Sequence, residues 1–181
     1  MSDETLVALR GKRVELKDPH ALCDLAIDYG YGQNGLSVDH TKCVDLMRQS
    51  AALGCPIAHF QLGVFHHEGG MGLEQNEKES LKYLRKAAEK GNIKALHNLG
   101  CAENESGDIV AAMRHWRLSA SRGSKLSMNS LIACFEDGYF HHGKLAETLQ
   151  TMYAARSEMK SEGRDHFIEH YLKRIGEYQE E

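Results

Sequence analysis

Apolar and small residues recur along the chain at the three- and four-residue spacing of amphipathic α-helices, and this pattern itself repeats. One alanine of the pattern recurs every 37 residues, at Ala21, Ala58 and Ala95. The only two prolines, Pro19 and Pro56, stand two positions before the first two alanines, at a helix start that tolerates a missing N–H. The spacing predicts an all-α fold of helix–loop–helix repeats.

From each alanine onward, equivalent positions carry apolar or small residues. The matched sets are Ala21, Leu25, Ala26, Tyr29 and Gly32; Ala58, Leu62, Gly63, His66 and Gly69; Ala95, Leu99, Gly100 and Glu103; and, in a degenerate fourth copy, Ser127, Leu131, Ile132, Phe135 and Gly138. Gly54, Gly91 and Gly123 are expected to end the second helices in the left-handed conformation. Gly63 and Gly100 are expected to let helices approach closely, opposite small residues of the second helices. Those small residues are Ala51, Ala88 and Ala120.

The repeat predicts a single solenoid domain over residues 1–181. Its predicted parts are an N-terminal capping helix at 3–17, repeats at 18–54, 55–91 and 92–123, a degenerate fourth repeat at 124–162, and a C-terminal capping helix at 163–181. Solenoids need capping helices because their terminal repeats otherwise expose an apolar face. We therefore expect nine helices.

The pattern A-x-x-x-L-G-x-x-Y-x-x-G, followed by K-A-x-x-W/L-x-x-x-A-A-x-x-G, resembles the Sel-one-like repeat (SLR) family. This family is related to the tetratricopeptide repeats, and the resemblance covers residues 18–138. It implies a right-handed α-solenoid whose first helices line a concave groove, and a scaffold or adaptor that binds other proteins. By similarity to tetratricopeptide grooves, positions two, six, nine and ten after each alanine point into the groove. The expected partner-binding residues are Phe60, Val64, His67, His97, Asn104 and Asn129.

Composition narrows the possible partners and location. Hydrophobic residues make up 41% and charged residues 27% of the chain, and no apolar stretch reaches the roughly 18 residues of a membrane span. A formal net charge of -4 gives no general attraction to nucleic acid or anionic lipid. The five cysteines lack the spacing of a disulfide framework or a zinc finger. No secretory-signal pattern stands at the start, so we expect an intracellular, cytoplasmic protein that binds proteins and neither nucleic acid nor membrane.

Histidine is abundant, with 11 copies, two pairs of which are adjacent. Neighbouring residues on a helix point about 100° apart, so His66 and His67 are not expected to bind one metal ion together. His66 is instead predicted to be buried and hydrogen-bonded. The second pair, His141 and His142, is predicted to lie in an exposed loop.

The C-terminal segment carries a motif that suggests one alternative function. His166, Glu169 and His170 match the H-x-x-E-H signature of zinc proteases, which makes a zinc-dependent hydrolase an alternative. That class needs a further carboxylate ligand and a cleft, so the motif is more simply a solvated helix face. We therefore expect no catalytic residue, cofactor or metal, and a non-enzymatic interaction module. A structural subunit of a larger assembly is the other alternative.

Overall fold

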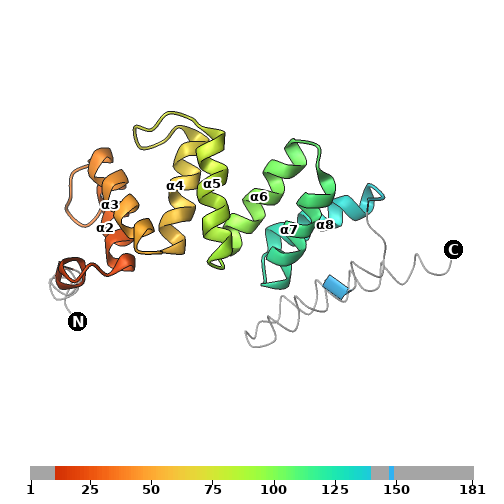
Figure 1. Ribbon diagram of the computed structural model, residues 1–181, viewed down its shortest axis with the longest axis horizontal. Helices are drawn as coiled ribbons and strands as arrows, with labels where there is room; N and C mark the ends of the chain where they lie inside the picture. Colours follow the sequence, from red (N-terminus) through yellow and green to blue (C-terminus); the bar gives the residue numbers. More distant parts are fainter. Residues whose placement is uncertain (1–10, 140–146, 149–181) are drawn as a thin grey trace. The chain divides into compact units, whose positions relative to one another are not determined.

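The computed structural model describes residues 11–139 and 147–148, and the regular structure among them is helical, without strands. The helices are α2 (Pro19–Tyr31), α3 (His40–Ala52), α4 (Pro56–Glu68), α5 (Glu77–Glu89), α6 (Ile93–Glu105), α7 (Ile109–Ser121) and α8 (Lys125–Glu136) (Figure 1). The predicted capping helix at 3–17 is described only from residue 11, with residues 11–15 helical. The one at 163–181, the rest of the fourth repeat and the pair His141–His142 lie outside the described residues.

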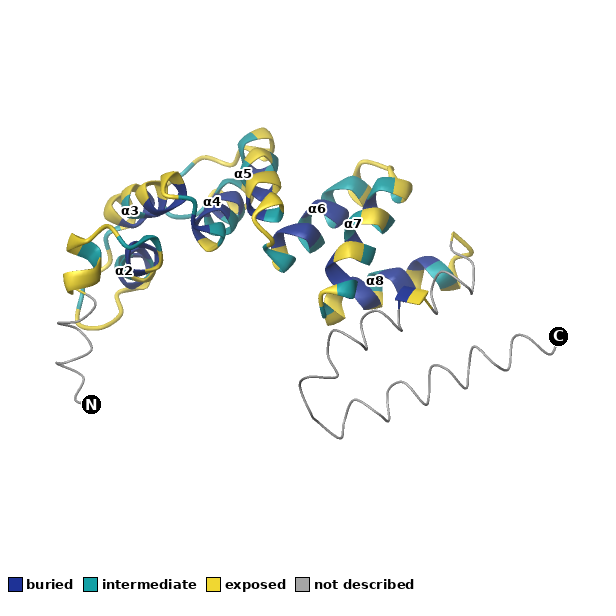
Figure 2. Cartoon of the chain, turned by 60° about the horizontal axis from the view of Figure 1, so that its bottom comes forward, coloured by how far each residue is buried: buried dark blue, intermediate teal, exposed yellow. Residues whose placement is uncertain are grey.

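Contacts divide the chain into two compact units, which we call unit 1 (Met1–Ala95) and unit 2 (Leu96–Glu181), with the boundary in the first turn of α6. In unit 1, α2 pairs with α3, α4 pairs with α5, and α3 also packs on α4. In unit 2, α7 packs on α8. Figure 2 shows buried residues along one side of the helices and exposed residues along the other.

Helix ends follow from capping residues at equivalent repeat positions. The Asp18 carboxylate accepts hydrogen bonds from the backbone N–H groups of His20 and Ala21, at 2.9 and 3.1 Å, and so caps α2. Second helices end where the chain turns into the left-handed region, with φ of 91° at Gly54, 87° at Gly91 and 97° at Gly123. The predicted role of these three glycines is confirmed.

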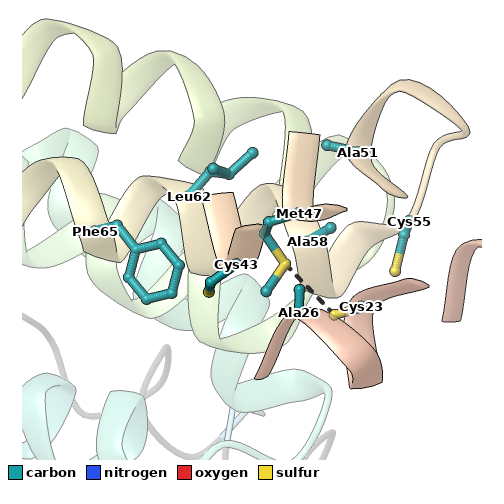
Figure 3. Close-up of a cluster of buried hydrophobic side chains, with 9 residues drawn as sticks. All are labelled: Cys23, Ala26, Cys43, Met47, Ala51, Cys55, Ala58, Leu62 and Phe65. Atoms are coloured by element: carbon teal, nitrogen blue, oxygen red, sulfur yellow. Dashed lines mark hydrogen bonds between the residues drawn. The ribbon is translucent and has the colours of Figure 1, made fainter. Parts of the chain in front are cut away.

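The core of unit 1 contains an unusual share of sulfur (Figure 3). Its buried cluster consists of Cys23, Ala26, Cys43, Met47, Ala51, Cys55, Ala58, Leu62 and Phe65. The Cys23 thiol donates to the Met47 sulfur at 3.6 Å, and Cys43 and Met47 are 0% exposed. Burial raises the pKa of the Cys23 thiol to about 12, since a thiolate there would lose its hydration. These cysteines are therefore packing residues.

Gly63 and Gly100 lie opposite large side chains, so the expectation that they face small alanines is wrong. A Cβ atom at Gly63 would lie 2.9 Å from Leu84, and one at Gly100 would lie 2.5 Å from the Trp116 Nε1 atom. The equivalent position in the first repeat is Ala26, which shares a buried cluster with Met47. The space left by a missing side chain on each first helix is filled by a large side chain from the second helix.

The environment of His66 also differs from the prediction. Its ring stacks on Tyr83, with centroids 5.7 Å apart and an interplanar angle of 9°. The Nδ1 atom is buried without a hydrogen-bond partner, so the predicted hydrogen bond is absent at that atom. A buried, hydrogen-bonded histidine does occur nearby, because the His59 Nδ1 atom lies 2.9 Å from the Cys55 carbonyl oxygen.

Candidate partner-binding site

Unit 2 contains a cavity of about 670 Å³ at the ends of α6 and α8. Its lining residues come from α6 and α8, which are the first helices of the third and fourth repeats, from α7, and from the residues that follow α8. The lining residues are Cys101, Asn104, Glu105, Gly107, Ile109, Trp116, Ser130, Ala133, Cys134, Asp137 and Tyr139. The volume lies within the range of about 300–1,000 Å³ that is typical of ligand pockets.

The repeat register explains which side chains reach the cavity. Cys101, Asn104 and Glu105 stand six, nine and ten positions after Ala95, at the outward positions of α6. In the fourth copy, positions six and ten after Ser127 also line the cavity; these are Ala133 and Asp137. The tight turn at Gly107, with φ of 88°, directs the chain from α6 into α7 beside this cavity.

Trp116 forms an apolar part of the cavity wall and is itself only 4% exposed. Its indole N–H donates to the His97 carbonyl oxygen at 3.3 Å, which fixes the ring against α6. Gly100 makes this approach possible, because any side chain there would meet the indole. The wall is therefore held by packing on one side and by a hydrogen bond on the other.

His97 links the two first helices of unit 2. Its Nδ1 atom lies 3.0 Å from the hydroxyl of the buried Ser127 in α8, and its Nε2 atom lies 3.6 Å from the Cys101 sulfur. Burial lowers the pKa of His97 below the ordinary value of 6.5, so the neutral imidazole is favoured. This side chain holds α6 to α8 beside the cavity, although it is not among the lining residues.

Negative charge gathers at this cavity. Glu105 and Asp137 line it, and neither forms an ion pair within the described residues. Burial raises the pKa values of the Cys101 and Cys134 thiols, and the nearby carboxylates of Glu105 and Asp137 respectively raise them further. The described residues that line this cavity include no lysine, arginine or histidine.

The expected partner-binding residues fall into two sets, one in each unit. Phe60, Val64 and His67 lie on α4 in unit 1, at the i, i+4 and i+7 positions of one helix face, and His67 is exposed while the other two are half-buried. On the neighbouring α2, a Cβ atom added to Gly30 would lie 3.4 Å from the Met71 sulfur. The loop after α4 therefore covers part of the first-helix face of the first repeat.

In unit 2 the expected residues have different environments. Asn104 is exposed and lines the cavity, Asn129 is exposed on α8, and His97 is half-buried. Glu105 and Asp137 stand at groove-facing positions of the repeat, although they are not among the expected partner-binding residues. Their position ten residues after the repeat alanine, or after Ser127 in the fourth copy, was the available signal.

Metal chemistry finds no support in the described part of the chain. Within residues 11–139 and 147–148, no group of three or more His, Cys, Asp or Glu side chains is arranged to hold an ion. The zinc-protease motif of His166, Glu169 and His170 lies outside those residues. The same described ranges contain no helix both long and apolar enough to cross a bilayer.

The hairpins and the cavity define an α-helical repeat protein whose first helices present a recess. The Sel1 repeat matches residues 19–55, 56–92 and 93–124, which together exceed half of the chain. This chain belongs to the Sel1 repeat family, whose members are generally protein–protein interaction modules and typically non-enzymatic.

Solved structures confirm the SLR solenoid fold class. A protective antigen present in uropathogenic Escherichia coli strains, which displays an SLR fold, is 26% identical with a TM-score of 0.70, over 82% of this chain and 33% of that one. A Sel1 repeat protein from Oxalobacter formigenes is 23% identical with a TM-score of 0.63, over 69% of this chain and 52% of that one. The chain thus matches about a third and about half of these two chains. Comparison with curated proteins gives no match.

Proposed function

We propose that this chain is a non-enzymatic adaptor or scaffold that binds a peptide or partner segment along the first helices of its repeats. The observation that carries the proposal is the cavity of unit 2, because outward positions of both α6 and α8 line it. A recess with an aromatic wall and polar groups at its edge suits a partner side chain, since apolar contact provides affinity and polar groups provide orientation.

The face of α4 supports the same function in unit 1. Phe60 and Val64 are half-buried, so each offers apolar surface without being fully committed to the core. His67 is exposed one turn further along and can donate or accept a hydrogen bond. An apolar anchor beside a polar group is the arrangement that peptide-binding helical surfaces use.

Charge and thiol chemistry support a protein partner in the cytoplasm. The formal net charge of -4 disfavours nucleic acid, whose backbone is also negative. All five cysteines are free, and four of them are buried in the helical cores. Free thiols suit a reducing compartment, where disulfides are rare.

The test uses the partner that co-purifies from the native source, at defined salt and pH. We expect Phe60→Ala to weaken binding by about 2 kcal/mol, which is roughly thirtyfold. The double variant His67→Ala/His97→Ala is also expected to weaken binding, because it removes the His67 hydrogen bond to the partner and the His97 contact that holds α6 to α8. Leu53→Ala is the matched control, because Leu53 is 49% exposed and follows a second helix of unit 1.

Circular dichroism separates a lost contact from a lost fold in each variant. Unchanged affinity in Phe60→Ala and in the double histidine variant contradicts binding on the first helices. Equal weakening by Leu53→Ala contradicts it as well, because the effect is then not confined to that face. Co-purification of the chain in a fixed ratio that resists all of these variants favours the structural-subunit alternative.

A further inference from the structure

We propose that the cavity at the ends of α6 and α8 is a subsite for a positively charged side chain, lysine or arginine, of the partner segment. The proposal deepens the function proposed above, since it assigns the chemistry of the residue that this cavity accepts. It commits to a basic segment because the two charged residues among the described lining, Glu105 and Asp137, are both acidic.

Both carboxylates stand where a helix already carries negative partial charge. Glu105 is the last residue of α6, and Asp137 is the C-cap residue of α8. A helix C-terminus carries the negative end of the helix dipole, which favours cations there and disfavours anions. Neither α6 nor α8 has a basic residue in its last turn. Two helix ends and two carboxylates therefore face this cavity, and no described lining residue supplies a compensating cation.

Local electrostatics of this kind costs stability in the free protein, and such a departure from favourable charge placement is typical of functional sites. The carboxylates also act on the cavity wall, because they help to raise the pKa values of the Cys101 and Cys134 thiols. A bound cation relieves both effects. The preference of the cavity for a cation thus comes from the two helix C-termini as well as from the two acidic residues.

The remaining lining suits the rest of a long basic side chain. Trp116 offers apolar surface on one wall for the methylene groups, and Tyr139, which is 59% exposed, offers an aromatic ring. Guanidinium groups stack on such rings, and ammonium groups lie over their faces. A second cavity in unit 2, of about 320 Å³, is lined by Arg114, Arg117 and Glu147, so its described lining carries both signs of charge and is not purely acidic like that of the first cavity.

The experiment uses the full chain and a small probe, N-acetyl-arginine N-methylamide, with the lysine derivative as a second arm. The neutral control is the citrulline derivative, which keeps the shape of arginine but lacks its charge. Trp116 is the only tryptophan, so its indole N–H gives one resonance that reports directly on the cavity wall. We expect a saturable shift of that resonance with the cationic probes, little shift with citrulline, and weaker binding as salt is added.

Two double variants are compared, and each removes two negative charges, one at the cavity and the other away from it. Glu105→Gln/Asp137→Asn is expected to weaken binding of the arginine probe by about three- to tenfold, since each exposed ion pair contributes modestly. Glu74→Gln/Glu89→Gln, at exposed positions of unit 1, is expected to leave it unchanged. The cavity variant is also expected to unfold at a higher temperature than the wild type, because it removes anions from helix C-termini.

Two results overturn the proposal. The first is a citrulline shift as large as the arginine shift, or no saturable shift with either cation. The second is full binding of the arginine probe by Glu105→Gln/Asp137→Asn. If the co-purified partner still binds that variant with wild-type affinity, the subsite is wrong while partner binding on the first helices stands. If the probe binds but no partner engages the first helices, the proposed function fails and the subsite stands.

Discussion

Replacing Gly100 by alanine tests the helix packing of unit 2 most directly. The added methyl group would lie 2.5 and 2.6 Å from the Nε1 and Cδ1 atoms of Trp116, and 3.1 Å from the Ala112 carbonyl oxygen. The indole is buried and hydrogen-bonded to His97, so it has little room to withdraw. The equivalent change at Gly63 meets the Cγ and Cδ2 atoms of Leu84 at 2.9 Å and the Ser80 carbonyl oxygen at 3.3 Å, and the aliphatic Leu84 side chain can adjust more readily than an indole ring.

Two opposing contributions decide whether each glycine-to-alanine change raises or lowers the free energy of unfolding. Alanine in place of glycine within a helix contributes about 1 kcal/mol through intrinsic propensity. Against this, overpacking a core costs about 1–3 kcal/mol, and breaking the Trp116 to His97 hydrogen bond costs about 1 kcal/mol more. We therefore expect Gly100→Ala to lower the free energy of unfolding by about 1–3 kcal/mol. Gly63→Ala is expected to change it by less than about 1 kcal/mol, because the two effects nearly cancel.

Urea unfolding followed by circular dichroism measures these changes, and Trp116 fluorescence reports on unit 2 alone. A rescue variant makes the reasoning sharper. Gly100→Ala/Trp116→Met reproduces the Ala26 and Met47 combination of the first repeat, so its cost should fall short of the summed single costs by about 1–2 kcal/mol. The packing argument is refuted if Gly100→Ala is as stable as the wild type, or if the two substitutions are additive.

Three further predictions concern single contacts. Burial lowers the pKa of His97, so the unfolded chain binds more protons than the folded chain below pH 6.5. The free energy of unfolding should therefore fall as the pH drops below that value. His97→Gln should weaken this pH dependence, which urea unfolding at several pH values measures. Ser50→Ala removes the 2.5 Å hydrogen bond from the Ser50 hydroxyl to the Pro19 carbonyl oxygen, and it should lower the free energy of unfolding by about 1 kcal/mol in thermal unfolding. The control Ser37→Ala should have almost no effect, because Ser37 is exposed. Asn92→Ala removes the cap on the Ala95 amide and should cost about 1–2 kcal/mol by the same assay.

Helix pairing was predictable from the sequence because it depends on local spacing. The repeated alanines mark the buried side of each first helix, and Ala21, Ala58 and Ala95 are all 0% exposed. Counting positions from them also predicts that Asn104 faces outward, and it does line the cavity. Both inferences need only the period of a helix, which a single chain displays.

Contacts between helices were less predictable, because they depend on the register of one helix against the next. The spacing does not show that Trp116 lies against Gly100, or that Tyr83 stacks on His66. The meeting of Glu105 and Asp137 at one cavity has the same origin, since the two residues are 32 positions apart in sequence. Such convergence becomes visible only when the ends of both helices are placed.

The sulfur atoms in the core of unit 1 determine how oxidation can damage the protein (Figure 3). Peroxide attacks thiolates, and a pKa of about 12 leaves Cys23 almost entirely protonated at neutral pH. Met47 needs no ionisation to form a sulfoxide, but it is 0% exposed. An oxidant can therefore reach Met47 only when α2 and α3 separate, so the rate of Met47 oxidation reports how often this hairpin opens. A sulfoxide formed during such an opening places a polar oxygen where no water reaches, so the damaged chain refolds poorly until the sulfoxide is reduced.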